Sequence, residues 1–208
     1  MPESADERGR RFDALFASYG SDMVAYCHWR AESASDAQDA AAEVFLAAWR
    51  RLDQLPEGEE ARLWLYATAR RVLANQRRSN RRRLALQERL ALEAASAPAE
   101  PPSLGQDEAL VHEALRRLEP GDREVLLLAE WEGLTAAEIA AVLDCLTVTA
   151  RGRLHRARRR FQAAFEQAKA SASPSSSPRG RGDAPDVGVL RQARAMRQTQ
   201  TFQEVIDA

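Results

Sequence analysis

The sequence predicts an all-α protein with two small helical domains joined by a flexible linker, a helix-turn-helix in the second domain, and a C-terminal extension. Apolar residues recur every three to four positions along most of the chain, and we find no convincing run of the alternating pattern of a strand. A Pro-rich stretch near the middle interrupts this pattern. The composition, 45% hydrophobic and 29% charged over 208 residues, is typical of a soluble protein with a core.

Three segments of the first domain carry the helical spacing: "FDALFASYGSDMVAYC", "DAAAEVFLAAWRRL" and "ARLWLYATARRVLANQRR". Before the second segment, Ser35 and Gln38 fit the capping box that opens many helices. In the third, Arg62, Tyr66 and Arg70 follow one another at four-residue spacing, with Leu73 and Arg77 continuing the stripe. A ring between guanidinium groups suits unstacked bases of a single strand. The same pattern fits an alternative interpretation, in which Tyr66 lies at the edge of the core and the arginines beside it are solvated.

The linker is predicted in "AASAPAEPPSLGQD", residues 94–107, whose prolines and small residues neither sustain a helix nor fill a core. Helical spacing resumes in "EALVHEALRRL" and "REVLLLAEWEG". Pro120 suits the first position of a helix, and Thr135 with Glu138 forms a second capping box.

The stretch "GLTAAEIAAVLDCLTVTARGRLHRARRR" predicts a helix-turn-helix, with a first helix over 135–143 and a second from Thr147 to Phe161. At one hundred degrees per residue, Ala150, Leu154, Ala157 and Phe161 share one face of the second helix. The opposite arc carries Arg151, Arg156 and Arg159 and has no acid before residue 166, whereas a merely solvated face mixes both signs. Such a helix fits the major groove of duplex DNA.

The extension begins with "SASPSSSPRGRGDAPDVG", a Ser/Pro/Gly-rich tether predicted to be disordered. After it, Val189, Met196, Phe202 and Ile206 lie on one face of a predicted amphipathic helix, which we expect either to dock on the chain as a regulatory element or to be a tail without function. The predicted first domain, linker, second domain and extension are residues 10–93, 94–107, 108–168 and 169–208.

Charge is segregated along the chain although its net value is only −1. Residues 30–60 hold eight acids and three arginines, whereas 61–95 hold nine arginines and two acids. The same change from acidic to basic recurs between 96–146 and 147–169. Each predicted domain therefore joins an acidic surface to a basic one, and basic surfaces favour nucleic-acid partners.

No enzyme motif competes with this interpretation. His28, His112 and His155 are scattered, and the chain has no HExxH, no Gly-rich phosphate loop and no G-x-S-x-G. We predict no catalytic residue, no metal site and no cofactor. Cys27 and Cys145 lack metal-ligand spacing and are interpreted as small apolar residues. Without a long apolar run or a signal peptide, we expect a cytoplasmic protein without membrane insertion.

Four blocks in order, "SDAQDAAAEVFLAAWRRLDQL", "ARLWLYATARRVLANQRR", "LEPGDREVLLLAEWEGLTAAEIAAVL" and "GRLHRARRRF", resemble a bacterial RNA polymerase sigma factor of the extracytoplasmic-function (ECF) group of the sigma-70 family. The resemblance covers residues 10–167. It implies that the first domain binds the clamp region of the largest polymerase subunit and opens the −10 promoter element. The second domain would read the −35 element as a duplex, so promoter DNA and core polymerase are the expected partners.

The resemblance also assigns residues. The polymerase-binding acids would be Asp36, Asp39 and Glu43, on the side of their helix opposite Phe45 and Trp49. The acidic loop "DQLPEGEEA" would capture a flipped base. The −10 element would be bound by Arg62, Tyr66, Arg70, Arg71, Asn75, Arg77 and Arg78. The −35 element would be bound by Val148, Thr149, Arg151, Gly152, Arg153, His155, Arg156 and Arg159.

This chain departs from the family pattern at the helix-turn-helix. Asp144 stands where glycine is usual, and it tolerates left-handed geometry better than most residues, so we expect the turn to form with some strain. Leu146 stands where a serine cap is usual, so Thr147 is expected to cap the second helix one residue later. Two alternatives remain at this point: a helix-turn-helix regulator that binds DNA without joining polymerase, and a helical adaptor without a nucleic-acid role. The sequence leaves open whether an anti-sigma factor binds the chain.

Overall fold

The computed structural model describes residues 5–90 and 106–172, and every regular element in these ranges is helical. The all-α prediction is therefore confirmed for the described chain. The chain divides into two compact units, Met1–Pro98 and Ala99–Ala208. The predicted extension helix and most of the predicted linker lie outside the described residues.

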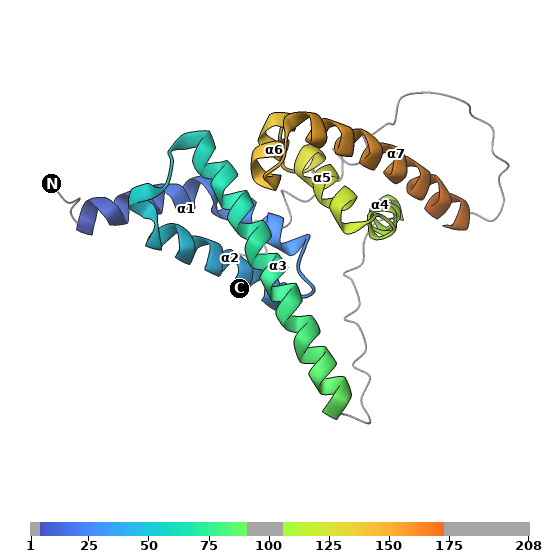
Figure 1. Ribbon diagram of the computed structural model, residues 1–208, viewed down its shortest axis with the longest axis horizontal. Helices are drawn as coiled ribbons and strands as arrows, with labels where there is room; N and C mark the ends of the chain where they lie inside the picture. Colours follow the sequence, from blue (N-terminus) through green and yellow to red (C-terminus); the bar gives the residue numbers. More distant parts are fainter. Residues whose placement is uncertain (1–4, 91–105, 173–208) are drawn as a thin grey trace. The chain divides into compact units, whose positions relative to one another are not determined.

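Three helices form the first unit: α1 (Ala5–His28), α2 (Ala34–Arg50) and α3 (Gly58–Leu90), with a 3-10 turn, η1 (Leu52–Gln54), between the last two (Figure 1). Each helix contacts the other two. Their apolar faces meet in a core because each sequence repeats apolar residues at helical spacing. Its largest fully buried side chains are Met23, Tyr26, Val44, Leu52, Leu65 and Tyr66.

The start of α2 differs from the prediction. Ser33, not Ser35, is the N-cap: its hydroxyl accepts a hydrogen bond from the Asp36 backbone N–H at 3.0 Å. The same hydroxyl donates to the Asp36 carboxylate at 2.8 Å. Ser33 has the extended backbone that an N-cap requires, whereas Ser35 already lies within the helix. The capping box predicted for Ser35 and Gln38 is therefore wrong.

Four helices form the second unit: α4 (Gln106–Arg116), α5 (Pro120–Glu130), α6 (Ala136–Leu143) and α7 (Thr147–Ala172). α7 packs along the other three, as Figure 1 shows. α4 begins within the range predicted for the linker, and α7 continues two residues into the tether predicted from Ser171. Both helices are longer than their apolar periodicity indicates, since a solvated turn adds little to that pattern.

The predicted starts of α5 and α6 are confirmed. Pro120 occupies the first turn of α5. In the capping box of α6, the Thr135 backbone N–H donates to the Glu138 carboxylate at 2.7 Å, and the Glu138 N–H donates to the Thr135 hydroxyl at 3.3 Å. These bonds satisfy donors that the first turn of a helix leaves unpaired. They fix where the helix-turn-helix begins.

Two ion pairs attach α7 to α5. The guanidinium of Arg158 donates to the buried Glu130 carboxylate, and that of Arg160 donates to Asp122. These contacts orient α7 about its own axis, because they hold one side of the helix against α5. The opposite side is left facing solvent.

Candidate nucleic-acid interface

The turn between α6 and α7 forms although it has no glycine. Asp144 adopts the left-handed conformation, with φ 51° and ψ 57°. Beyond it, the Cys145 N–H donates to the Ala140 carbonyl at 3.0 Å, which closes the end of α6 as a glycine turn would. The expectation that Asp144 supports the turn is confirmed. The left-handed geometry is less favourable for aspartate than for glycine.

α7 begins one residue earlier than a cap at Thr147 would require. The Leu146 carbonyl accepts the first helical hydrogen bond, from the Ala150 N–H at 3.0 Å, and Thr147 is already helical. The expected cap at Thr147 is therefore wrong. Leu146 occupies the N-cap position, where its side chain has no oxygen to accept a hydrogen bond. Because the start of α7 is not delayed, the side chains facing outward are those expected from helical spacing.

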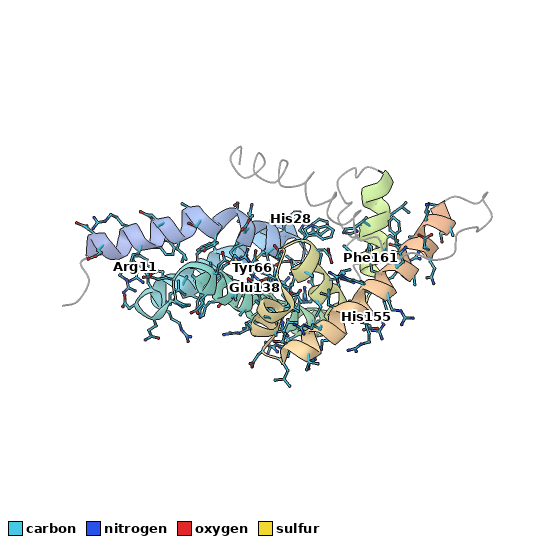
Figure 2. All side chains as sticks on the ribbon, turned by 90° about the horizontal axis from the view of Figure 1, so that it is seen from above. Arg11, His28, Tyr66, Glu138, His155 and Phe161 are labelled. Atoms are coloured by element: carbon cyan, nitrogen blue, oxygen red, sulfur yellow. The ribbon has the colours of Figure 1, made fainter. Side chains whose placement is uncertain are left out.

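The two faces of α7 are confirmed. Ala150, Leu154, Ala157 and Phe161 are all buried against the other helices of the unit. His155 and Phe161 lie on different sides of the helix, as Figure 2 shows. The outward face consists of Val148, Arg151, Arg153, His155, Arg156 and Arg159, which are exposed, and Thr149 and Gly152, which are partly exposed.

The arginines of α7 fall into two groups. Arg158 and Arg160 form ion pairs with α5. Within the part of the second unit that the structure describes, the four outward arginines have no carboxylate partner. These four are Arg151, Arg153, Arg156 and Arg159. The first turn of α7 contains no acid either, so this face carries an uncompensated positive charge. A helix face of this kind matches the phosphates that border a DNA groove.

The predicted −10 residues of α3 do not form one surface. Arg70, Arg71, Asn75 and Arg78 are exposed, with Arg78 donating to the Asn75 side chain. The other two arginines have structural contacts. Arg62 pairs with Glu59 at 3.0 Å, and Arg77 donates to the Arg30 carbonyl at 2.6 Å. The exposed basic side of α3 extends further along the helix than predicted, through three residues that the run "RRR" could have indicated: Arg81, Arg82 and Arg83.

Tyr66 was expected to be available to a base, and this is wrong. Its side chain is 1% exposed, and its ring centroid lies 5.2 Å from that of Tyr26 on α1. Its neighbours Leu65, Ala69 and Leu73 are buried as well. The buried face of α3 is therefore wider than helical spacing indicated, because α1 covers the positions beside the arginines. Tyr66 is the core tyrosine of the alternative interpretation.

The acids of α2 lie where the sequence indicated. Asp39 and Glu43 are exposed, one helical turn apart, whereas Asp36 is half-buried and bound to Ser33. An exposed Leu46 follows on the same stripe, at the next three-residue step. The exposure of Leu46 was not predicted, because apolar spacing alone does not distinguish a core residue from a surface one.

The opposite side of α2 packs on α1 as expected, but not completely. Phe45 is buried, with its ring 4.8 Å from that of Phe16. Trp49 remains partly exposed, although Phe12 contacts its ring edge to face at 5.2 Å and Arg8 lies over it. These ring contacts stabilise the α1–α2 pair.

Side chains of α1 form hydrogen bonds with both ends of the acidic loop between α2 and α3. Arg8 donates to both carboxylate oxygens of Asp53, at 2.6 and 2.7 Å, and Arg11 donates to the Leu52 carbonyl at 3.1 Å. The Tyr19 hydroxyl donates to the carbonyl of Gly58, whose φ is positive at 57°. The loop therefore has a defined shape while Glu57, Glu59 and Glu60 stay exposed.

Two other kinds of feature are absent from the described residues. No cluster of three or more histidine, cysteine or carboxylate side chains is arranged to bind a metal ion there. None of the described helices is both long and apolar enough to span a bilayer.

Models of two regions of one protein family match the chain. The model for sigma-70 region 2 matches residues 15–83, which include the acids of α2 and the arginines of α3. The model for sigma-70 region 4 matches residues 108–161, which include the helix-turn-helix.

Curated relatives of the chain are also RNA polymerase sigma factors. The chain is 29% identical over 168 residues to the RNA polymerase sigma-H factor of Pseudomonas aeruginosa, covering 76% of this chain and 87% of the relative. It is 30% identical over 136 residues to the ECF RNA polymerase sigma factor BldN of Streptomyces coelicolor, covering 64% of this chain and 52% of that protein. The chain thus spans most of the first relative and about half of the second.

A solved structure shares the fold. The sigma factor RpoE of Bartonella quintana, crystallised with the anti-sigma factor NepR, superposes with a TM-score of 0.61 at 24% identity, over 74% of this chain and 96% of that one. The two family models match the two units in the same order along the chain. The curated relatives are sigma factors as well. That family consists of transcription initiation factors that act with RNA polymerase and are not enzymes. The chain belongs to the sigma-70 family of RNA polymerase sigma factors, in its extracytoplasmic-function group.

Proposed function

We propose that this sigma factor binds the clamp region of the largest polymerase subunit through α2, opens the −10 element with α3 and its preceding loop, and reads the −35 element with α7. The observation that carries the proposal is the outward face of α7, whose four arginines have no carboxylate partner among the described residues of the second unit. A helix with one packed face and one basic face is the element that enters a major groove in helix-turn-helix proteins.

In the −35 contact, position along α7 sets the role of each side chain. Val148, Thr149 and Arg151 lie in its first turns, where residues of a recognition helix reach base edges. Arg151 has the geometry for a bidentate contact to guanine, and His155 lies one turn later on the same side. Arg153, Arg156 and Arg159 hold phosphates, which contribute affinity for every sequence.

In the −10 contact, the exposed residues of α3 follow the backbone of the opened strand. These are Arg70, Arg71, Asn75 and Arg78. Arg77 supports them indirectly, because its bond to the Arg30 carbonyl fixes α3 against the end of α1. Flipping a base costs a few kcal/mol. A loop already tied to α1 at Asp53 and Gly58 loses little further freedom when it receives that base.

In the polymerase contact, Asp39, Glu43 and Leu46 form one exposed stripe of α2. The two carboxylates suit a basic partner surface, and the leucine adds apolar area that binding would bury. Asp36 lies one turn earlier, where its carboxylate and its backbone N–H are both bonded to the hydroxyl of the N-cap residue Ser33. The regulator alternative does not account for the match of residues 15–83 to sigma-70 region 2.

A core-binding titration tests this proposal. Asp39→Lys/Glu43→Lys is expected to weaken the affinity for core polymerase by roughly tenfold or more, because two favourable contacts become repulsive. The matched control is Asp6→Lys/Asp13→Lys, which makes the same change of charge at exposed positions of α1. Both variants should keep the helical circular dichroism of the parent, since exposed charges add little to stability. Equal core affinity for the two variants would contradict the assignment of α2.

A further inference from the structure

The outward face of α7 is not uniformly basic. Leu146 and Val148, at its N-terminal end, are 72% and 70% exposed, the highest values for large apolar side chains in the described part of the chain. Neither packs into the core of its unit, so neither exposure is explained by folding. Exposed apolar side chains gain free energy when a partner covers them.

One turn further along the same face stands Gly152. Glycine is among the least favourable residues in the interior of a helix. A Cβ at Gly152 would meet only the Nη1 atom of Arg156, at 3.5 Å, which is an ordinary contact. Nothing in the described part of the unit therefore requires a glycine here. Because Val148 and Gly152 are four residues apart, the missing side chain leaves a low area of helix backbone directly beside the valine, next to the flexible side chain of Arg156.

We infer that Val148 and Gly152 form a seat for the C5-methyl group of a thymine in the −35 element, with Leu146 at its edge. This inference rests on the proposed function, since it places α7 in a major groove. The thymine methyl is the apolar group that base edges present there. The arginines around the seat, Arg156 and Arg159 among them, match DNA phosphates and would disfavour an apolar protein partner.

The two residues contribute in different ways. Val148 supplies the apolar surface that the methyl group buries. Gly152 lets the base edge approach the helix backbone, where any larger side chain would hold it away. Burial of a single methyl group predicts an affinity about fourfold higher for a duplex with thymine at this position than for one with the same base lacking its methyl.

The first test removes that methyl alone. A duplex is selected by the full chain with core polymerase from a randomised pool, and it is synthesised again with each thymine replaced in turn by deoxyuridine. For the parent chain, one position should lose on the order of fourfold in affinity. For Val148→Ala, the loss at that position should fall to less than about twofold, because the methyl no longer meets an apolar surface.

The second test separates stability from binding. Gly152→Ala should raise the melting temperature by roughly 4–8 °C, since alanine is the better helix former. The same variant should bind the selected duplex more weakly than the parent. Gly121→Ala is the control: Gly121 is exposed near the start of α5, and a Cβ there meets nothing within 4 Å. It should leave the affinity for the duplex unchanged.

The outcomes distinguish this inference from the function on which it rests. A selected duplex that tolerates deoxyuridine at every position would overturn the thymine seat and leave the proposed function standing. Full duplex affinity in Gly152→Ala would overturn the role of the glycine. If no duplex is selected, the proposed function fails and the inference fails with it.

Discussion

The carboxylate of Glu130 on α5 accepts two hydrogen bonds from Arg158 on α7, from Nη2 at 2.6 Å and from Nε at 3.0 Å. The glutamate side chain is 1% exposed, and that of Arg158 is 35% exposed. The next residue, Arg159, faces solvent. Two consecutive arginines of one helix therefore serve different purposes, the first in holding α7 in place and the second in the proposed contact with DNA.

Arg158→Ala should lower the free energy of unfolding by about 3 kcal/mol, because it leaves a buried carboxylate without its guanidinium. Arg159→Ala should change it by less than about 0.5 kcal/mol. Urea denaturation followed by circular dichroism measures both. The double variant Glu130→Leu/Arg158→Leu should lose less than Arg158→Ala, since no charge is left buried. Similar losses for Arg158→Ala and Arg159→Ala would show that the pair does not stabilise the unit.

Arg159→Ala should weaken duplex binding about equally for all sequences and reduce the slope of log affinity against log salt by roughly one unit, as for the loss of one phosphate contact. Arg151→Ala should instead relax the preference for the selected sequence, because this residue lies near the base edges. Filter binding at several salt concentrations checks both. Identical behaviour of the two variants would mean that the outward face is assigned incorrectly.

Asp144→Gly should stabilise the second unit by about 0.5–1 kcal/mol, because glycine adopts the left-handed conformation without the strain of a side chain. Asp144→Val should destabilise it, since a β-branched residue tolerates that conformation poorly. Thermal denaturation of the two variants gives the comparison. A less stable glycine variant would mean that the aspartate side chain contributes something that the backbone geometry does not reveal.

Leu146→Ser should stabilise α7 by about 1 kcal/mol, because the hydroxyl would accept a hydrogen bond from a first-turn N–H that the leucine cannot satisfy. Thr147→Ala is the control and should change stability by less than about 0.5 kcal/mol, since Thr147 is already inside the helix. Hydrogen exchange of the first-turn amides of α7 localises the effect. A large loss of stability in Thr147→Ala would restore that residue as the cap.

Helical spacing alone predicted the faces of α7, because the apolar period and the sign of the charge agree there. Spacing failed at Tyr66, whose burial depends on where α1 lies, and no local pattern contains that information. The prediction of the α2 cap was wrong for a related reason: Ser33 and Ser35 are both suitable residues, and backbone geometry selects between them.

Long-range contacts account for what the sequence did not indicate. The pairing of Arg158 with Glu130 joins residues 28 positions apart, and that of Arg8 with Asp53 joins residues 45 apart. Until such partners are known, the free and paired arginines of a helix look alike in the sequence. The exposed Leu46 is a similar case, since a surface contact with another protein leaves the same periodicity as a core contact.

Run-off transcription tests the claim that this chain joins core polymerase and selects promoters with both units. Core polymerase is supplied with a library of duplex fragments, with and without the chain, and the transcripts are sequenced. The transcripts should depend on the chain and start downstream of two spaced elements shared by the active fragments. Their yield from the same fragments should be lower for Asp39→Lys/Glu43→Lys. Binding of the chain to a shared duplex element without any chain-dependent transcript would contradict the claim and favour a regulator that never joins polymerase.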